Sequence, residues 1–127
     1  MQDLIIPQEG FSPKVSFLAS KGLLEISGNS YQEGTPEFYE PIFQWLDTYL
    51  DQPGKELQFN FRMSYFNTSS SKCFYKIIEK LKNYDASDKG KVEVNWYYKD
   101  DDEDMYETGM DYLNDSAWKK LNLISYK

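Results

Sequence analysis

The sequence has no histidine and a single cysteine, Cys73, in 127 residues. Without histidine the chain lacks the commonest general base and the commonest metal ligand, which excludes Ser/His/Asp and Cys/His catalytic arrangements. One cysteine cannot form an intrachain disulfide, and without histidine a structural zinc site is not expected. Cys73 falls in an amphipathic stretch, so we expect a small buried side chain in a protein of a reducing compartment.

Several sequence signals of common function classes are also missing. Neither G-x-G-x-x-G nor G-x-x-x-x-G-K-[ST] occurs, so no nucleotide-binding phosphate loop is predicted. No apolar run reaches the roughly 20 residues of a transmembrane helix, and the N-terminus lacks the basic region of a secretory signal. Lys and Arg number 14 against 21 Asp and Glu, a net charge of -7 that disfavours nucleic acid and membrane insertion. We expect a cytosolic protein without cofactors.

The hydrophobic pattern predicts a single α/β domain over residues 1–127. Period-two alternation favours strands at 14–19, 23–27, 57–65 and 92–96, and helical spacing favours helices at 37–51, 69–82 and 103–114. Residues 4–6 form an edge strand or an arm, and 120–126 a possible terminal strand. The order β-β-α-β-α-β-α predicts a mixed sheet with right-handed crossovers and helices packed on it.

Helix boundaries carry further expectations. Thr35 is expected to cap the first helix, and Pro41 to delay its regular part to about residue 39 or 40. Residues 28–34 and 83–90 are expected to be polar connections. Gly109 lies inside the third helix, where it costs about 1 kcal/mol against Ala, so we expect close packing there.

The most informative stretch is 64–81, where a strand meets an amphipathic helix. Phe74, Ile77, Ile78 and Leu81 repeat at helical spacing and should be buried. Asn67 and then four hydroxyl residues, 68–71, stand at the helix start, where one side-chain oxygen suffices as a cap. We expect Thr68 to be that cap. The spare hydroxyls lie in the positive potential of a helix N-terminus, a favourable place for a phosphate.

Two groups of charged residues carry further expectations, one within this stretch and one after it. Thr68, Lys72, Lys76 and Lys80 recur every four residues and form a stripe that is either a solvated helix face or a docking surface, with the lysines exposed. The acidic run 100–104 lacks the Gly and Glu that an EF-hand loop needs at its sixth and twelfth positions. Its carboxylates therefore either stabilise a helix N-terminus or form a surface read by a partner.

Three motifs carry a family resemblance that covers nearly the whole chain. They are PEFYEPIFQWL (36–46), SYFNTSSSK (64–72) and VNWYYKDDDEDMYETGMDY (94–112). In this order they resemble the SiaC family of small regulatory phosphoproteins. The middle motif also resembles the strand–helix junction of STAS-type domains, the fold of anti-sigma-factor antagonists, where Asp-Ser-Ser-Gly-Leu opens a helix and its first Ser is phosphorylated. Asn67, Thr68, Ser69 and Ser70 fall on the first four of those positions.

The resemblance implies a non-catalytic, phosphorylation-switched signalling protein with a STAS-like fold. Thr68 would be phosphorylated by a partner kinase that supplies ATP and Mg²⁺, and a PP2C-type phosphatase would reverse the modification; Ser69 is the alternative acceptor. The unphosphorylated form would bind and regulate an effector, such as a diguanylate cyclase in cyclic-di-GMP signalling. The residues near the phosphosite that would form the interaction surface are Asn67, Ser69, Ser70, Lys72 and Lys76.

Two other hypotheses remain open from the residues alone. The 11 Tyr, 8 Phe and 3 Trp form either core and rim or, in part, a constitutive protein- or ligand-binding surface without phosphorylation. A small enzyme that works with carboxylates is the third hypothesis, although no pair of acids stands out.

Overall fold

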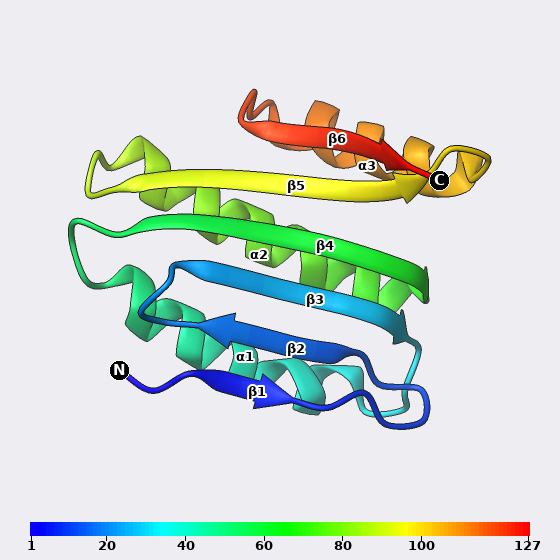
Figure 1. The fold of residues 1–127 in the computed structure, drawn as a ribbon, viewed down its shortest axis with the longest axis horizontal. Coiled ribbons are helices and arrows are strands. Elements are labelled where there is room, and N and C mark those ends of the chain that lie inside the picture. Colours follow the sequence, from blue (N-terminus) through cyan, green and yellow to red (C-terminus); the bar gives the residue numbers. More distant parts are fainter.

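A computed structural model describes all 127 residues as one six-stranded sheet with three helices (Figure 1). The strands are β1 (Leu4–Ile6), β2 (Lys14–Leu18), β3 (Leu23–Ser30), β4 (Glu56–Phe66), β5 (Lys91–Lys99) and β6 (Leu121–Tyr126). The helices are α1 (Thr35–Leu50), α2 (Thr68–Ala86) and α3 (Glu103–Ser116). Residues 4–6 are thus an edge strand, and the terminal strand exists.

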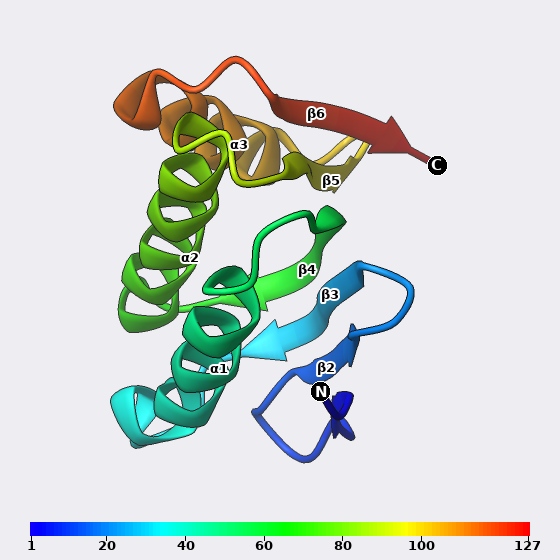
Figure 2. The ribbon, with the colours of Figure 1, turned by 90° about the vertical axis from the view of Figure 1, so that its left-hand side faces the viewer.

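The strands lie in the sheet in the order of the sequence. β1, β2 and β3 pair antiparallel, and β3 to β6 pair parallel, each parallel step being bridged by one helix. Because every crossover moves in the same direction with the same hand, the three helices lie on one face of the sheet (Figure 2). The predicted mixed α/β architecture is confirmed.

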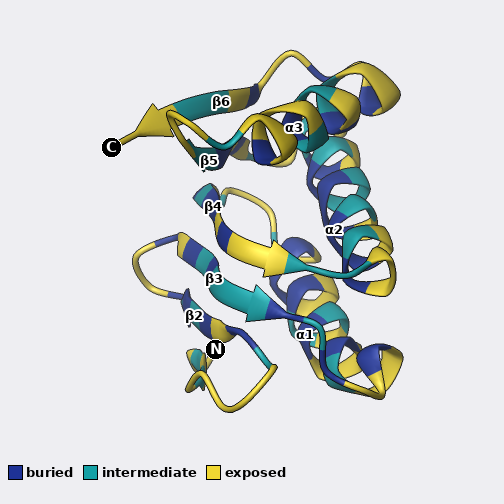
Figure 3. Cartoon of the chain, turned by 90° about the vertical axis from the view of Figure 1, so that its right-hand side faces the viewer, coloured by how far each residue is buried: buried dark blue, intermediate teal, exposed yellow.

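The core fills the space between the sheet and the helices, where the buried faces of both meet (Figure 3). β4 places Leu57, Phe59, Phe61 and Met63 on this face by alternation, and α2 contributes its predicted buried face. The other face of the sheet has no covering helix and carries many polar side chains. There Asn60, Asn95 and Asn122 hydrogen-bond through their side chains from strand to strand.

The start of α1 differs from the prediction. Gly34, in the left-handed conformation at φ 69°, precedes the helix, and no side chain caps it. Thr35 is already the first helical residue, and its hydroxyl donates to the Gln32 carbonyl at 3.0 Å. The expected delay by Pro41 is also wrong: Pro41 lies inside the helix, and the carbonyl it leaves without an amide partner belongs to the exposed residue Glu37.

Two predicted polar connections are shorter than expected because they are packed. α2 continues to Ala86, held by Tyr84, whose buried hydroxyl donates to the Gln52 carbonyl at 2.8 Å. β3 continues to Ser30 through a register shift after Gly28, since these residues pair with β4.

Gly109 does lie in close packing, as predicted: a Cβ there would approach Trp96 Cδ1 to 2.6 Å. None of the three helices combines the length and the hydrophobicity that crossing a bilayer requires.

Candidate functional site

The junction between β4 and α2 places the hydroxyl run at the carboxyl edge of the parallel strands. Asn67, in extended conformation, is the residue that caps α2: its Oδ1 accepts from the Ser70 amide at 2.9 Å. The prediction that Thr68 caps the helix is wrong by one residue. Thr68 is instead the first residue of α2 and is exposed, as is Ser69.

Ser70 anchors the start of α2 in a buried polar network. Its hydroxyl donates to the Ser30 carbonyl at 2.8 Å and lies 2.8 Å from Ser30 Oγ, which lies 2.7 Å from the Tyr39 hydroxyl. Burial raises the pKa of Tyr39 well above its ordinary value, so the phenol stays neutral and can donate. Ser70 is fully buried, so it positions the junction from within and does not lie on the surface expected from the sequence.

Ser71 is held by α3. Its hydroxyl lies 2.6 Å from the Tyr112 hydroxyl, which also donates to the Ser71 carbonyl at 3.0 Å. Burial raises the pKa of Tyr112 to about 12, so this phenol stays neutral even above pH 10, where an exposed tyrosine ionises. Of the four consecutive hydroxyls, two therefore fix the helix to β3, α1 and α3, and two, Thr68 and Ser69, face solvent.

The lysine stripe of α2 divides into two parts. Lys72 and Lys76 are exposed and line a hollow of about 550 Å³ between α2 and α3, together with Ser71, Tyr75, Tyr112 and Asp115. Because Thr68, Ser71, Lys72 and Tyr75 are three or four residues apart along the helix, this hollow opens on the same face as Thr68. Lys80 is not exposed as expected: it is half-buried and pairs with Asp47 of α1 at 2.7 Å.

An exposed aromatic cluster lies beside the junction, and sequence reasoning did not locate it. The Phe11 and Tyr31 rings lie 4.7 Å apart and the Tyr31 and Tyr65 rings 5.1 Å apart, and Phe11 and Tyr65 are both more than half exposed. The Asn67 amide donates to the Ser30 carbonyl, which places Tyr31 next to the start of α2. Only the abundance of aromatics pointed to such a surface, because Phe11 and Tyr31 lie in connections without periodicity.

The acidic run forms the start of α3. Asp102 caps the helix by accepting from the Met105 amide at 3.0 Å, and Glu103 and Asp104 occupy the first turn, which agrees with the helix N-terminus interpretation. Asp102 and Asp104 also line a hollow of about 300 Å³ with Tyr65 and Phe66. No group of three or more Cys, Asp or Glu side chains is placed to hold a metal ion.

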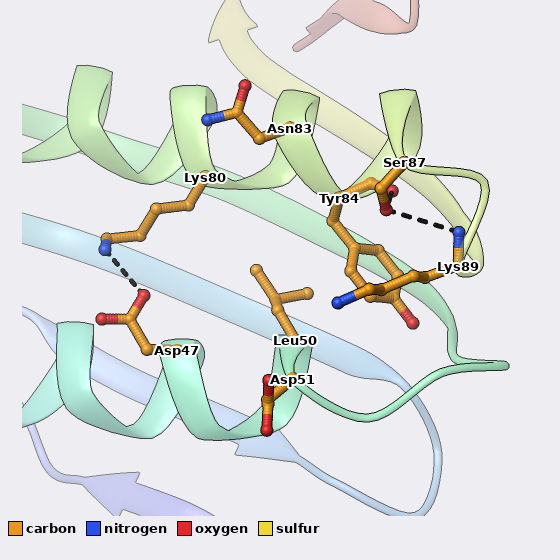
Figure 4. A pocket seen from close by; sticks show the side chains of 8 residues that line it. All are labelled: Asp47, Leu50, Asp51, Lys80, Asn83, Tyr84, Ser87 and Lys89. Carbon is orange, nitrogen blue, oxygen red and sulfur yellow. Dashed lines mark hydrogen bonds and ion pairs between the residues drawn. The ribbon is translucent and has the colours of Figure 1, made fainter.

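A further hollow, of about 310 Å³, lies between the C-terminal turns of α1 and α2 (Figure 4). Its charged side chains include Lys80, which points at Asp47 and is neutralised by it. Because α2 rises about 1.5 Å per residue, the lining residues Lys80 to Ser87 lie roughly 18–28 Å from Thr68 along the helix. This hollow is therefore separate from the junction.

Comparison with known proteins decides the family. A family model described as SiaC family regulatory phosphoprotein matches residues 6–126. The chain belongs to the SiaC family. The resemblance read from the three sequence motifs is thereby confirmed, and the protein is a member of a family of regulatory phosphoproteins.

Individual relatives agree with this assignment. An uncharacterised protein of Pseudomonas aeruginosa (strain UCBPP-PA14) is 28% identical over 119 residues, which cover 93% of each chain. The crystal structure of apo-SiaC from P. aeruginosa is similar at 25% identity with a TM-score of 0.87, covering 98% of this chain and 99% of that one. SiaC in complex with the diguanylate cyclase SiaD, of which it is the activator, has a TM-score of 0.90 at 24% identity, covering 98% of this chain and all of that one.

Proposed function

We propose that this SiaC-family protein is a non-catalytic switch whose phosphate acceptor is Thr68. A partner kinase phosphorylates Thr68, a PP2C-type phosphatase removes the phosphate, and the unphosphorylated form binds a cytosolic effector, a diguanylate cyclase. The observation that carries the proposal is the exposed Thr68 hydroxyl in the first turn of a helix whose cap and anchors are supplied by other residues.

The surroundings of Thr68 suit a phosphate. The amides of Thr68 and Ser69, in the first turn, donate to no acceptor within the chain, and the N-terminal end of α2 carries partial positive charge. Lys72 is one turn further on the same face and can pair with the added dianion. We therefore expect the fold to tolerate phosphorylation at this position.

The effector surface is proposed to include the same helix end. Lys72 and Lys76 line the hollow between α2 and α3, and the exposed Thr68 and Ser69 precede them at the start of the same helix. Asn67 connects this helix end to Phe66 and Tyr65 of β4, and Tyr65 belongs to the aromatic cluster with Phe11 and Tyr31. Exposed aromatic rings are the side chains that most often dominate binding energy at protein interfaces. Burying a phosphate dianion against such a surface without a partner charge is unfavourable, so phosphorylation should weaken binding.

The test compares two adjacent positions with the same modification. The effector is first captured from the source organism with the unphosphorylated protein. Two modified proteins are then made by synthesis, one with phosphothreonine at 68 and one with phosphoserine at 69. The affinity of each for the effector is measured by titration calorimetry and compared with that of the unphosphorylated protein. We expect phosphothreonine at 68 to weaken binding at least tenfold, about 1.4 kcal/mol, with an unchanged circular dichroism spectrum. Mass spectrometry of the protein after treatment with the kinase should place the phosphate on Thr68.

Three outcomes would contradict the proposal. Phosphate found on Ser69 or outside 68–71 would displace the acceptor. Equal effector affinities in both states would favour a constitutive binding module, the function that the exposed aromatic cluster alone supports. Binding by the phosphorylated form only would require a phosphate-reading pocket on the partner and reverse the direction of the switch.

A further inference from the structure

We draw no further inference here: the strongest candidate, the edge of the sheet at β6, has no strand on its outer side and neither charge nor proline within the strand, but charges of both signs lie at each of its ends and nothing in the structure shows what covers it.

Discussion

The helix cap and the proposed phosphate acceptor are adjacent residues, and stability measurements can separate them. Asn67→Ala removes the oxygen that accepts from the Ser70 amide at 2.9 Å, and should lower the free energy of unfolding by about 0.5–2 kcal/mol. Thr68→Ala removes an exposed side chain that caps nothing. Because alanine has the highest helix propensity, the cost should be below about 0.5 kcal/mol, and the change can be slightly stabilising.

The size of the Asn67 effect is limited by what remains after the substitution. The Asn67 backbone amide still donates to the Ser30 carbonyl at 3.1 Å, and the Ser70 hydroxyl keeps its buried partners. The junction therefore stays attached to β3 while one amide of the first turn loses its acceptor. A loss of about 1 kcal/mol corresponds to a fall in Tm of about 3–5 °C for a domain of this size.

Urea denaturation followed by circular dichroism measures both variants. Asn67→Asp is the matched control, since it retains an acceptor oxygen at the cap and should stay within about 0.5 kcal/mol of wild type. A larger loss for Thr68→Ala than for Asn67→Ala would refute the assignment of the cap. If the assignment holds, Thr68→Ala is a non-phosphorylatable variant with unchanged stability, so any effect on signalling can be ascribed to the lost acceptor.

Two further predictions concern α3. Gly109→Ala should destabilise the protein by about 1–3 kcal/mol despite the better helix propensity of alanine, because its Cβ would lie 2.6 Å from Trp96 Cδ1 and 2.7 Å from Leu123 Cδ2; a thermal midpoint at or above that of wild type would contradict this packing. Stability should fall as pH rises from 10 toward 12, because an unfolded tyrosine ionises near pH 10 while burial raises the pKa of Tyr112 to about 12. Urea titrations at pH 9, 10 and 11 should show a shallower fall for Tyr112→Phe, and equal slopes would contradict the assignment.

The sequence was sufficient to predict the order of elements and the buried face of α2, because both follow from hydrophobic periodicity. Phe74, Ile77, Ile78 and Leu81 are all fully buried, as the spacing indicated. Helix boundaries were less predictable, since capping depends on local backbone geometry: Asn67 and Thr68 are both good caps, and the extended conformation of Asn67 selects it. The burial of Ser70 could not be predicted, because its partners Ser30 and Tyr39 come from distant segments.

The construction of the junction has a consequence for how a phosphate would act. Ser70 and Ser71 attach the start of α2 to β3, α1 and α3 through buried or half-buried hydroxyls, and these contacts do not involve the exposed hydroxyls of Thr68 or Ser69. We therefore expect the proposed phosphorylation of Thr68 to leave these anchoring hydrogen bonds in place. A modification can shift an equilibrium only by interacting differently with the two states. Since these anchoring contacts do not involve the phosphorylated side chain, we expect the free-energy difference of the proposed switch to arise from direct contact between the phosphate and the partner surface.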